Sequence, residues 1–200
     1  MTFFSGLTQS EQESFKAYRS GTHYSHNFSY DLNQKLKNDE RIPKRFQPHL
    51  SNLDHVTLKT KLKSDLILYR AAYGDSVDTL LNGKAYKGFV AASDKNNCLG
   101  RYFNQHATAC NTDAYYIIVK CPKGSRVAIF DESRQQTSTD YIIPRDSRFT
   151  LVSREELTHS ADIRALAGTI NARKLKKIIK IELVLKKRNW LAEVLKKVRK

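Results

Sequence analysis

The order of the local patterns along the chain is what most constrains its fold. Helical signals lie before residue 63, and segments rich in β-branched and aromatic residues dominate after it. In the last of these segments, Ile179, Ile181, Leu183 and Leu185 alternate along the chain and so share one face of a strand. Helices followed by strands predict an α+β protein with a mostly antiparallel sheet or a sandwich. The expected strands are DLILYRAA (65–72), KGFVAAS (87–93), AYYIIVK (114–120), RVAIF (126–130), DYIIP (140–144), FTLVS (149–153) and IIKIELVL (178–185).

The N-terminal part carries its own helix signals. Thr8 is followed three residues later by Glu11, which is the spacing of a capping box and predicts that a helix begins here. Two further helices are expected near residues 32–37 and 53–62. The span between them holds Pro43 and Pro48, which we expect to separate the two helices.

We expect one domain over residues 1–187, with a helical part (1–63) and a mostly β core (64–187). A basic amphipathic helix is expected at 188–200, with lysines opposite one apolar face. Another helix is expected after Ser93, which is a residue type that caps helices. The apolar face of this helix would hold Cys98, Leu99, Tyr102 and Phe103. The apolar face of the C-terminal helix would hold Trp190, Leu191, Val194, Leu195 and Val198.

Charge and cysteine content limit the setting of the protein. The net charge is +15, and residues 171–200 hold 12 Lys or Arg against 2 acids, so this segment carries +10 of it. Concentrated basic charge favours a polyanionic or acidic partner, although a solubilising tail has the same composition. No apolar run approaches the roughly 18 residues of a membrane span, and no signal peptide is evident at the start. Three cysteines without a scaffold spacing favour a reducing cytosol, so we expect a cytoplasmic location.

Common catalytic devices are missing from the sequence. It has no G-x-G-x-x-G motif, Walker loop or G-x-S-x-G elbow. Cys98, His106, Cys110 and Cys121 match no standard zinc spacing, so we expect no metal site. What remains is an ordered set of an arginine, a serine and an acid, each at a strand end.

Arg70 lies near the end of one expected strand, Ser93 ends another, and Asp140 begins a third. A guanidinium group suits bidentate binding of a diphosphate. A carboxylate beside a sugar can accept a hydrogen bond from its 2′-hydroxyl and stabilise an oxocarbenium-like transition state. Taken singly, Arg70 could pair with a surface acid, and Ser93 and Asp140 could cap a helix and a turn. The ordered combination favours a catalytic site.

The chain resembles the R-S-E class of mono-ADP-ribosyltransferases, which includes the enzymatic subunits of clostridial binary toxins and phage-encoded modifying enzymes. The resemblance covers nearly the whole chain, in six pieces that follow in the family's order. The quoted pieces are LTQSEQESFKAYRSGTHYSHNFSYDLNQKL for the N-terminal helices, DLILYRAA for the arginine strand, KGFVAAS for the Ser-Thr-Ser strand, YYIIVKCPKGSRVAIF for a strand pair, DYIIPRDSRFTLVS for the catalytic strand, and IIKIELVL for the final strand.

The resemblance implies a split β-sandwich that binds NAD in its cleft, cleaves the nicotinamide–ribose bond and transfers ADP-ribose to a nucleophile. The implied catalytic residues are Arg70 at the phosphates, Ser93, and Asp140 at the nicotinamide ribose. Residues 133–139 would form the loop that faces the acceptor, with Gln136 and Ser138 reading it, and residues 104–113 a loop near the phosphates. The implied NAD-binding residues are Arg70, Ala71, Phe89, Ala91, Ser93, Tyr24 and Asn27.

Several positions depart from the family pattern. Asp140 stands where the family has Glu, and Ala91 and Ala92 replace the first Ser and Thr. Ser138 replaces the Glu that accompanies arginine acceptors or the Gln that accompanies others, which disfavours arginine. We therefore expect a toxin or antiphage effector that modifies nucleic acid, with RNA first. A host-protein acceptor and a non-catalytic binding module on a decayed transferase fold stay open, as does an acidic antitoxin or immunity protein as partner.

Overall fold

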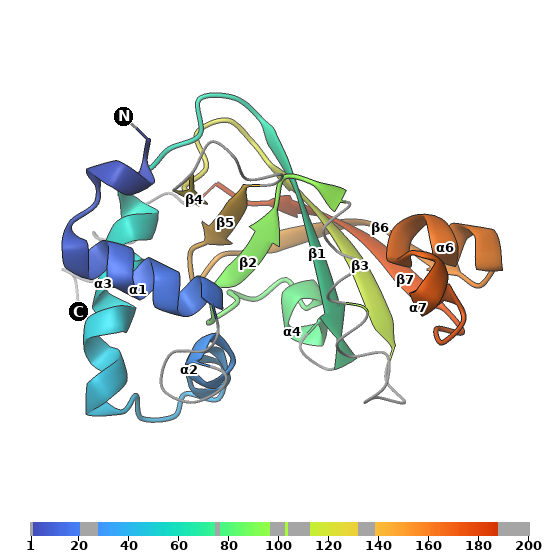
Figure 1. The fold of residues 1–200 in the computed structure, drawn as a ribbon, viewed down its shortest axis with the longest axis horizontal. Coiled ribbons are helices and arrows are strands. Elements are labelled where there is room, and N and C mark those ends of the chain that lie inside the picture. The colour runs from blue at the N-terminus through green and yellow to red at the C-terminus, as the bar shows by residue number, and fades with distance from the viewer. Residues whose placement is uncertain are drawn as a thin grey trace.

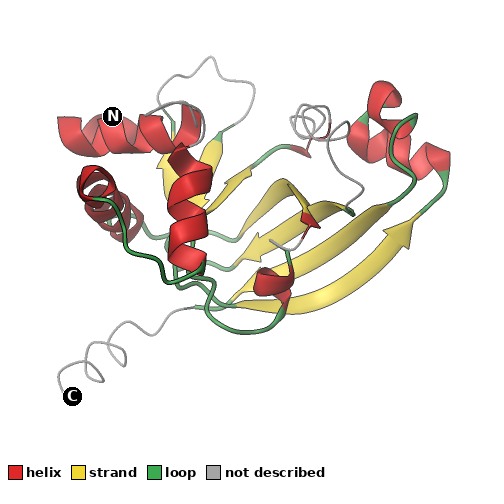
Figure 2. Cartoon of the chain, turned by 90° about the horizontal axis from the view of Figure 1, so that it is seen from below, coloured by secondary structure: helices red, strands yellow, loops and turns green. Residues whose placement is uncertain are grey.

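A computed structural model describes residues 2–20, 28–74, 77–96, 103, 113–131 and 139–187. It contains a twisted seven-stranded sheet with helices gathered at its two ends (Figures 1 and 2). The expected helix after Ser93, apart from residue 103, and the expected helix at 188–200 lie outside the described residues. The strands of the sheet are β1 (Leu66–Tyr73), β2 (Val90–Ser93), β3 (Ala114–Cys121), β4 (Ala128–Phe130), β5 (Asp140–Ile143), β6 (Phe149–Leu157) and β7 (Ile178–Leu185).

The strands follow the order β4-β5-β2-β1-β3-β7-β6. Every strand pair is antiparallel except β3 with β7, which confirms the expected mostly antiparallel sheet. The two halves meet where β1 lies beside β2, and these strands share a single register pair, Tyr69 with Ser93. By contrast, β1 and β3 pair along all eight residues from Leu66 to Tyr73. The sheet is therefore nearly split between β2 and β1, and the two halves separate on either side of that contact.

Helices cover the β4–β5 end of the sheet (Figure 1). The predicted capping box at the start of the first helix is confirmed, because the Thr8 backbone N–H donates to Glu11 Oε2 at 2.9 Å and the Glu11 N–H donates to Thr8 Oγ1 at 3.4 Å. Lys59 also donates to Glu11 Oε2, at 2.6 Å, which ties the helix start to the end of the third helix. The helices here are η1 (Phe4–Gly6), α1 (Gln9–Ser20), α2 (Phe28–Lys37), η2 (Lys44–Phe46) and α3 (Gln47–Leu58).

Two helix boundaries differ from those expected. The second helix begins at Phe28, four residues before the predicted start at 32, and the third begins at Gln47 and ends at Leu58 rather than running over 53–62. Pro48 therefore lies inside the third helix, not between helices. It occupies the first turn, where a missing N–H breaks no helical hydrogen bond.

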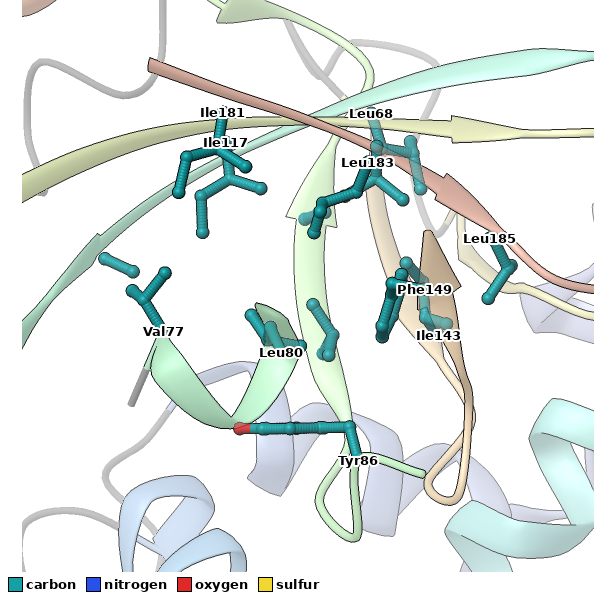
Figure 3. Packing of buried hydrophobic residues seen from close by; sticks show 14 of the residues in the cluster. Leu68, Val77, Leu80, Tyr86, Ile117, Ile143, Phe149, Ile181, Leu183 and Leu185 are labelled. Atoms are coloured by element: carbon teal, nitrogen blue, oxygen red, sulfur yellow. The ribbon is translucent and has the colours of Figure 1, made fainter. Parts of the chain in front are cut away.

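The core has three parts. The largest lies between the two halves of the sheet, where side chains from α4 (Asp78–Leu81) such as Leu80 face Ile117 and Ile181 of the long strands (Figure 3). The predicted apolar face of β7 is confirmed, since its four alternating residues are all buried there. A second cluster packs the N-terminal helices on β4, β5 and Phe89. The third lies under α6 (Ser160–Ala167) at the far end of the sheet.

Three α-helices of the described residues were not predicted, namely α4, α6 and α7 (Thr169–Ala172). Each is short, at four to eight residues, so few apolar positions repeat at helical spacing and the pattern is weak. Ile163 and Ala167, one turn apart on α6, are its buried residues. Among the described residues, no helix is long and apolar enough to cross a membrane.

Candidate active site

The candidate site lies where the sheet is nearly split. Arg70 on β1 pairs with Ile117 of β3 through its backbone, and its side chain reaches in the other direction, toward β2. There Arg70 Nη1 donates a hydrogen bond to the carbonyl oxygen of Ala91 at 2.6 Å. A partly exposed guanidinium group thus crosses the junction between the halves, and its remaining N–H groups have no partner among the described residues, so they can bind an anion.

Ser93 and Asp140 are direct neighbours across β2 and β5. Asp140 also pairs with Phe130 of β4, and Ser93 pairs with Tyr69 of β1. Four strands therefore place Phe130, Asp140, Ser93 and Tyr69 in one row, with Arg70 next to the last of them. The sequence-predicted Ser93 and Asp140, far apart in the chain, are therefore cross-strand neighbours, and Arg70 reaches the same strand, β2, at Ala91.

The Ser93 hydroxyl is held by backbone groups. It donates to the Thr139 carbonyl at 3.3 Å and accepts from the Lys95 N–H at 3.4 Å. Asp94 adds a second tie between the same strand ends, because the Thr139 N–H donates to its Oδ1 at 2.9 Å. Ser93 is 4% exposed, so its hydroxyl is held by these protein groups and not by water. Its hydroxyl stabilises the junction of β2 and β5 beside Asp140.

The carboxylate of Asp140 has a partner that the sequence did not indicate. Arg19, near the end of α1, donates from Nε to Asp140 Oδ2 at 2.5 Å. The Arg19 guanidinium also lies over the ring of Phe130, with Cζ 4.5 Å from the ring centroid. Because 121 residues separate Arg19 from Asp140, no local pattern could have predicted the contact.

A hydrogen-bond network around Asn33 holds the start of β2. The Phe89 N–H donates to Asn33 Oδ1 at 2.8 Å, and Asn33 Nδ2 donates to the Phe89 carbonyl at 3.2 Å and to the Tyr18 hydroxyl at 2.8 Å. The Tyr18 hydroxyl in turn donates to the Phe89 carbonyl at 3.1 Å. Gly88 lets Asn33 approach, since a Cβ there would lie 2.7 Å from Asn33 Oδ1. The helices and the site strand are thereby joined in one network.

The ring of Phe89 is buried in the core. Phe89 was expected among the NAD-binding residues, but its side chain is 0% exposed and packs edge-to-face on Tyr18 with 5.7 Å between centroids. The ring is a core side chain, and the Phe89 backbone anchors the start of β2. Ala91 is exposed and contributes its carbonyl to Arg70, and Ala71 is partly exposed on β1 opposite Tyr116.

A second cation lies within electrostatic range of Arg70. Burial, and then the positive charge of Arg70, lower the pKa of Lys37 on α2. Burial raises the pKa values of Tyr18 and Tyr86, and the charge of Arg70 opposes both shifts. Among the described residues, no carboxylate pairs with Arg70 or Lys37. Two cations without an acid partner form a place suited to a diphosphate.

Sequence reasoning missed Asn33, Lys37 and Arg19. Asn33 and Lys37 are four residues apart on α2 and so share a helix face, which was the available signal. The residues expected on the adenosine side, Tyr24 and Asn27, lie outside the described residues. So do Gln136 and Ser138 and most of the two expected loops, of which only Thr139 and Asp113 are described.

Of the residues considered as zinc ligands, Cys121 is the one that the structure describes. It lies buried at the end of β3, and burial raises the pKa of its thiol to about 12. A thiol that stays protonated is a poor metal ligand. The described part of the chain contains no cluster of three or more His, Cys, Asp or Glu side chains able to hold a metal ion.

The sequence and the fold of the chain were compared with those of known proteins. No protein-family model matches the chain. A curated relative, NAD(+)--arginine ADP-ribosyltransferase EFV of Enterococcus faecalis, is 30% identical over 125 residues, which is 60% of this chain and 25% of the relative. The chain therefore spans about a quarter of the length of that protein.

Solved structures match over most of the chain. C3larvin toxin, an ADP-ribosyltransferase from Paenibacillus larvae, aligns with a TM-score of 0.58 and 16% identity over 92% of this chain and 99% of that one. Plx2a, an ADP-ribosyltransferase toxin from the same species, aligns with a TM-score of 0.60 and 18% identity over 92% and 89%. The ADP-ribosylating toxin BECa of C. perfringens, solved with NADH, aligns with a TM-score of 0.59 and 12% identity over 97% and 47%. The expected fold is confirmed: the chain has the fold of these ADP-ribosyltransferase toxins.

Proposed function

We propose that this protein is an NAD-dependent mono-ADP-ribosyltransferase. The observation that carries the proposal is the convergence of Arg70, Ser93 and Asp140 at the near-split of the sheet. The fold shared with ADP-ribosyltransferase toxins and the similarity to the Enterococcus enzyme support it. NAD is the substrate, consumed in each turnover.

Each residue has a role that its chemistry allows. Arg70 and Lys37 hold the diphosphate: Arg70 bonds the Ala91 carbonyl of β2, and Lys37 lies one helical turn after Asn33, whose side chain binds the backbone at the start of β2. Asp140 accepts a hydrogen bond from the 2′-hydroxyl of the nicotinamide ribose and stabilises the positive charge that develops on that ring. Ser93 keeps the strand that carries Asp140 in register with β2.

The reaction itself needs little from the protein beyond placement and charge. The bond from ribose C1′ to the nicotinamide nitrogen breaks, its electron pair leaves with nicotinamide as a neutral molecule, and the ribose becomes oxocarbenium-like. The acceptor nucleophile then bonds to C1′ and loses its proton. Since the leaving group departs neutral, no general acid is required, and the carboxylate acts through its negative charge and its position.

The direct test is release of nicotinamide from NAD by the purified protein. Asp140→Asn keeps the shape of the side chain and removes its charge, so release should fall about a hundredfold to a thousandfold. Asp162→Asn, an exposed acid on the distant helix α6, is the matched control and should leave the rate unchanged. Absence of release by the folded wild-type protein would favour the alternative of a non-catalytic binding module.

For the acceptor, we propose nucleic acid, with RNA first, because the last 30 residues carry +10 and phosphate contacts attract polyanions strongly. The second candidate is an arginine of a host protein, which the similarity to the arginine ADP-ribosyltransferase of Enterococcus favours. An acidic antitoxin or immunity partner and a cytoplasmic site of action remain predictions from the sequence.

Labelled NAD incubated with a cell lysate separates the two acceptors. Label that RNase removes and protease leaves supports RNA. Label that survives both RNase and DNase and is lost to protease contradicts the nucleic-acid acceptor. Agmatine, a small guanidinium compound, then tests arginine: its modification by the wild-type protein but not by Asp140→Asn would assign guanidinium chemistry to this site.

A further inference from the structure

The contact between Arg19 and Asp140 is the strongest feature that the proposed function leaves unexplained. Arg19 Nε lies 2.5 Å from Asp140 Oδ2, and the two side chains are 41% and 33% exposed. Simple exposed ion pairs contribute little because both side chains lose freedom and solvent screens them. This pair differs from a simple exposed ion pair because the Arg19 side chain is packed against other groups.

The position of Arg19 is fixed by the aromatic ring on which it packs and by the anchoring of its own helix. Its guanidinium lies over Phe130, whose ring packs on Phe4 and Phe15 with centroids 4.7 and 5.2 Å away. All three rings are buried. The preceding residue, Tyr18, fixes the end of α1 by its hydrogen bond to the Phe89 carbonyl. A cation held on a packed aromatic base loses less freedom on binding a carboxylate than one on a free side chain.

Among the described residues, the other groups that could hold the Asp140 carboxylate are absent or engaged. Ala91, two residues before Ser93 on the neighbouring strand, has no hydroxyl. The hydroxyl of Ser93 is used by the backbone of Thr139 and Lys95. In the part of the chain that the structure describes, Arg19 is the side chain that bonds this carboxylate.

We propose that Arg19 is the positioning residue of the candidate catalytic acid. Nε fixes Oδ2, so the other oxygen, Oδ1, is the one that accepts the hydrogen bond from the ribose 2′-hydroxyl. The carboxylate of an aspartate lies one methylene closer to its own backbone than the carboxylate of a glutamate does. Arg19, near the end of α1, contacts the Asp140 carboxylate at this shorter distance from the β5 backbone. This inference rests on the proposed transferase function and adds to it a residue on α1.

The sign of the effect tests the inference, because a cation near a developing positive charge could also slow the reaction. If Arg19 positions the acid, its removal lowers the rate. If Arg19 is a restraint that NAD must displace, its removal raises the rate. The positioning role predicts a lower kcat with little change in KM, since the contact acts on the reacting ribose and not on the diphosphate.

The experiment measures nicotinamide release by Arg19→Met, Arg19→Ala and Arg19→Lys. Arg19→Met keeps an apolar cover on Phe130, so it separates loss of the hydrogen bond from loss of packing. We expect kcat to fall about tenfold to a hundredfold in Arg19→Met and Arg19→Ala, the size of effect that a misplaced catalytic group produces, with KM for NAD within about threefold. Arg19→Lys should recover part of the rate, because the ammonium can reach the carboxylate but lacks the planar face.

Lys16→Ala is the matched control. Lys16 lies on the same helix and over the ring of Phe4, 5.4 Å from its centroid, so the change removes one cation from α1 without touching Asp140. Its kinetics should equal those of the wild type. An equal loss of rate in Lys16→Ala and Arg19→Met would overturn the inference in favour of a general charge effect.

A double-mutant cycle with Asp140→Glu adds a second readout. The longer side chain carries its carboxylate past Arg19 Nε, so Arg19→Met should matter less than threefold in that background, whereas it matters tenfold or more beside Asp140. Full additivity, or an unchanged or higher rate in Arg19→Met alone, overturns the positioning role while Asp140-dependent release still stands. If release itself does not depend on Asp140, the proposed function fails first, which keeps the two failures distinct.

Discussion

Replacing Asn33 with alanine should destabilise the protein measurably, because Asn33 joins α2 to the start of β2. The change removes the acceptor of the Phe89 N–H and the donor shared by the Phe89 carbonyl and the Tyr18 hydroxyl. The carbonyl keeps its bond from Tyr18, but the Phe89 N–H loses its recorded partner. Phe89 precedes the first residue of β2, so the sheet supplies no replacement.

The size of the effect follows from these contacts. A buried N–H left without a partner costs about 1–3 kcal/mol, and a lost neutral hydrogen bond about 1 kcal/mol. Asn33 is itself half-buried, so water can replace part of what is lost. We expect a loss of about 2–3 kcal/mol in the free energy of unfolding, which for a chain of this length lowers Tm by about 4–12 °C.

Gly88 offers an independent route to the same network. An alanine Cβ there would lie 2.7 Å from Asn33 Oδ1 and 3.1 Å from the ring of Tyr86. Gly88→Ala should therefore push Asn33 away and lower Tm in the wild-type background. In an Asn33→Ala background most of the clash is gone, so the two changes should be less than additive by about 1 kcal/mol or more.

Urea denaturation followed by circular dichroism measures both effects. Asn38→Ala is the control, because Asn38 lies one residue beyond the same helix and its recorded side-chain bond is an exposed one to Glu40. Its effect should stay within about 0.5 kcal/mol. If Asn33→Ala unfolds at the same urea concentration as Asn38→Ala, the network does not hold β2 and the reasoning is wrong.

Three further predictions follow from the site and its support. Arg70→Lys should raise KM for NAD about tenfold in nicotinamide release, because a lysine cannot bond the β2 carbonyl and a diphosphate together as a guanidinium can. Cys121 should resist a thiol reagent at pH 8 in a Cys98→Ser, Cys110→Ser background and react once urea unfolds the chain, since burial raises its pKa to about 12. Rapid reaction in the folded state would contradict that burial. Burial acts to raise the pKa of Glu11, but its hydrogen bonds and the nearby Lys59 outweigh burial and hold this pKa below the ordinary value of a glutamate. Its stabilising effect is therefore present above the ordinary carboxyl pKa and is lost as the pH falls through the lowered one. Glu11→Gln should flatten this part of the stability profile in urea titrations between pH 3 and 7, and an unchanged slope would refute the assignment.

Local patterns predicted what depends on neighbours in the chain. The capping box of Thr8 and Glu11 forms as its spacing indicated, and β7 has the bounds of the predicted IIKIELVL segment. Both signals act within a few residues and need no knowledge of the rest of the fold. The errors share the same origin: α6 and α7 are too short for a repeat, and Pro48 was taken as a break because its neighbours were not recognised as a first helical turn.

The sequence by itself determined the order of the strands and of the N-terminal helices, and it identified the arginine, serine and acid; Ser93 and Asp140 lie at strand ends as expected, whereas β1 continues three residues beyond Arg70 to Tyr73. Only the tertiary structure decided which of these side chains meet. The register of β2 on β5 places Ser93 opposite Asp140, and the packing of α1 on Phe130 brings Arg19 to the same carboxylate. The physical reason is that propensity and capping act over a few residues, whereas register and packing join groups that lie far apart along the chain. The partner of Asp140, 121 residues away, is the clearest case.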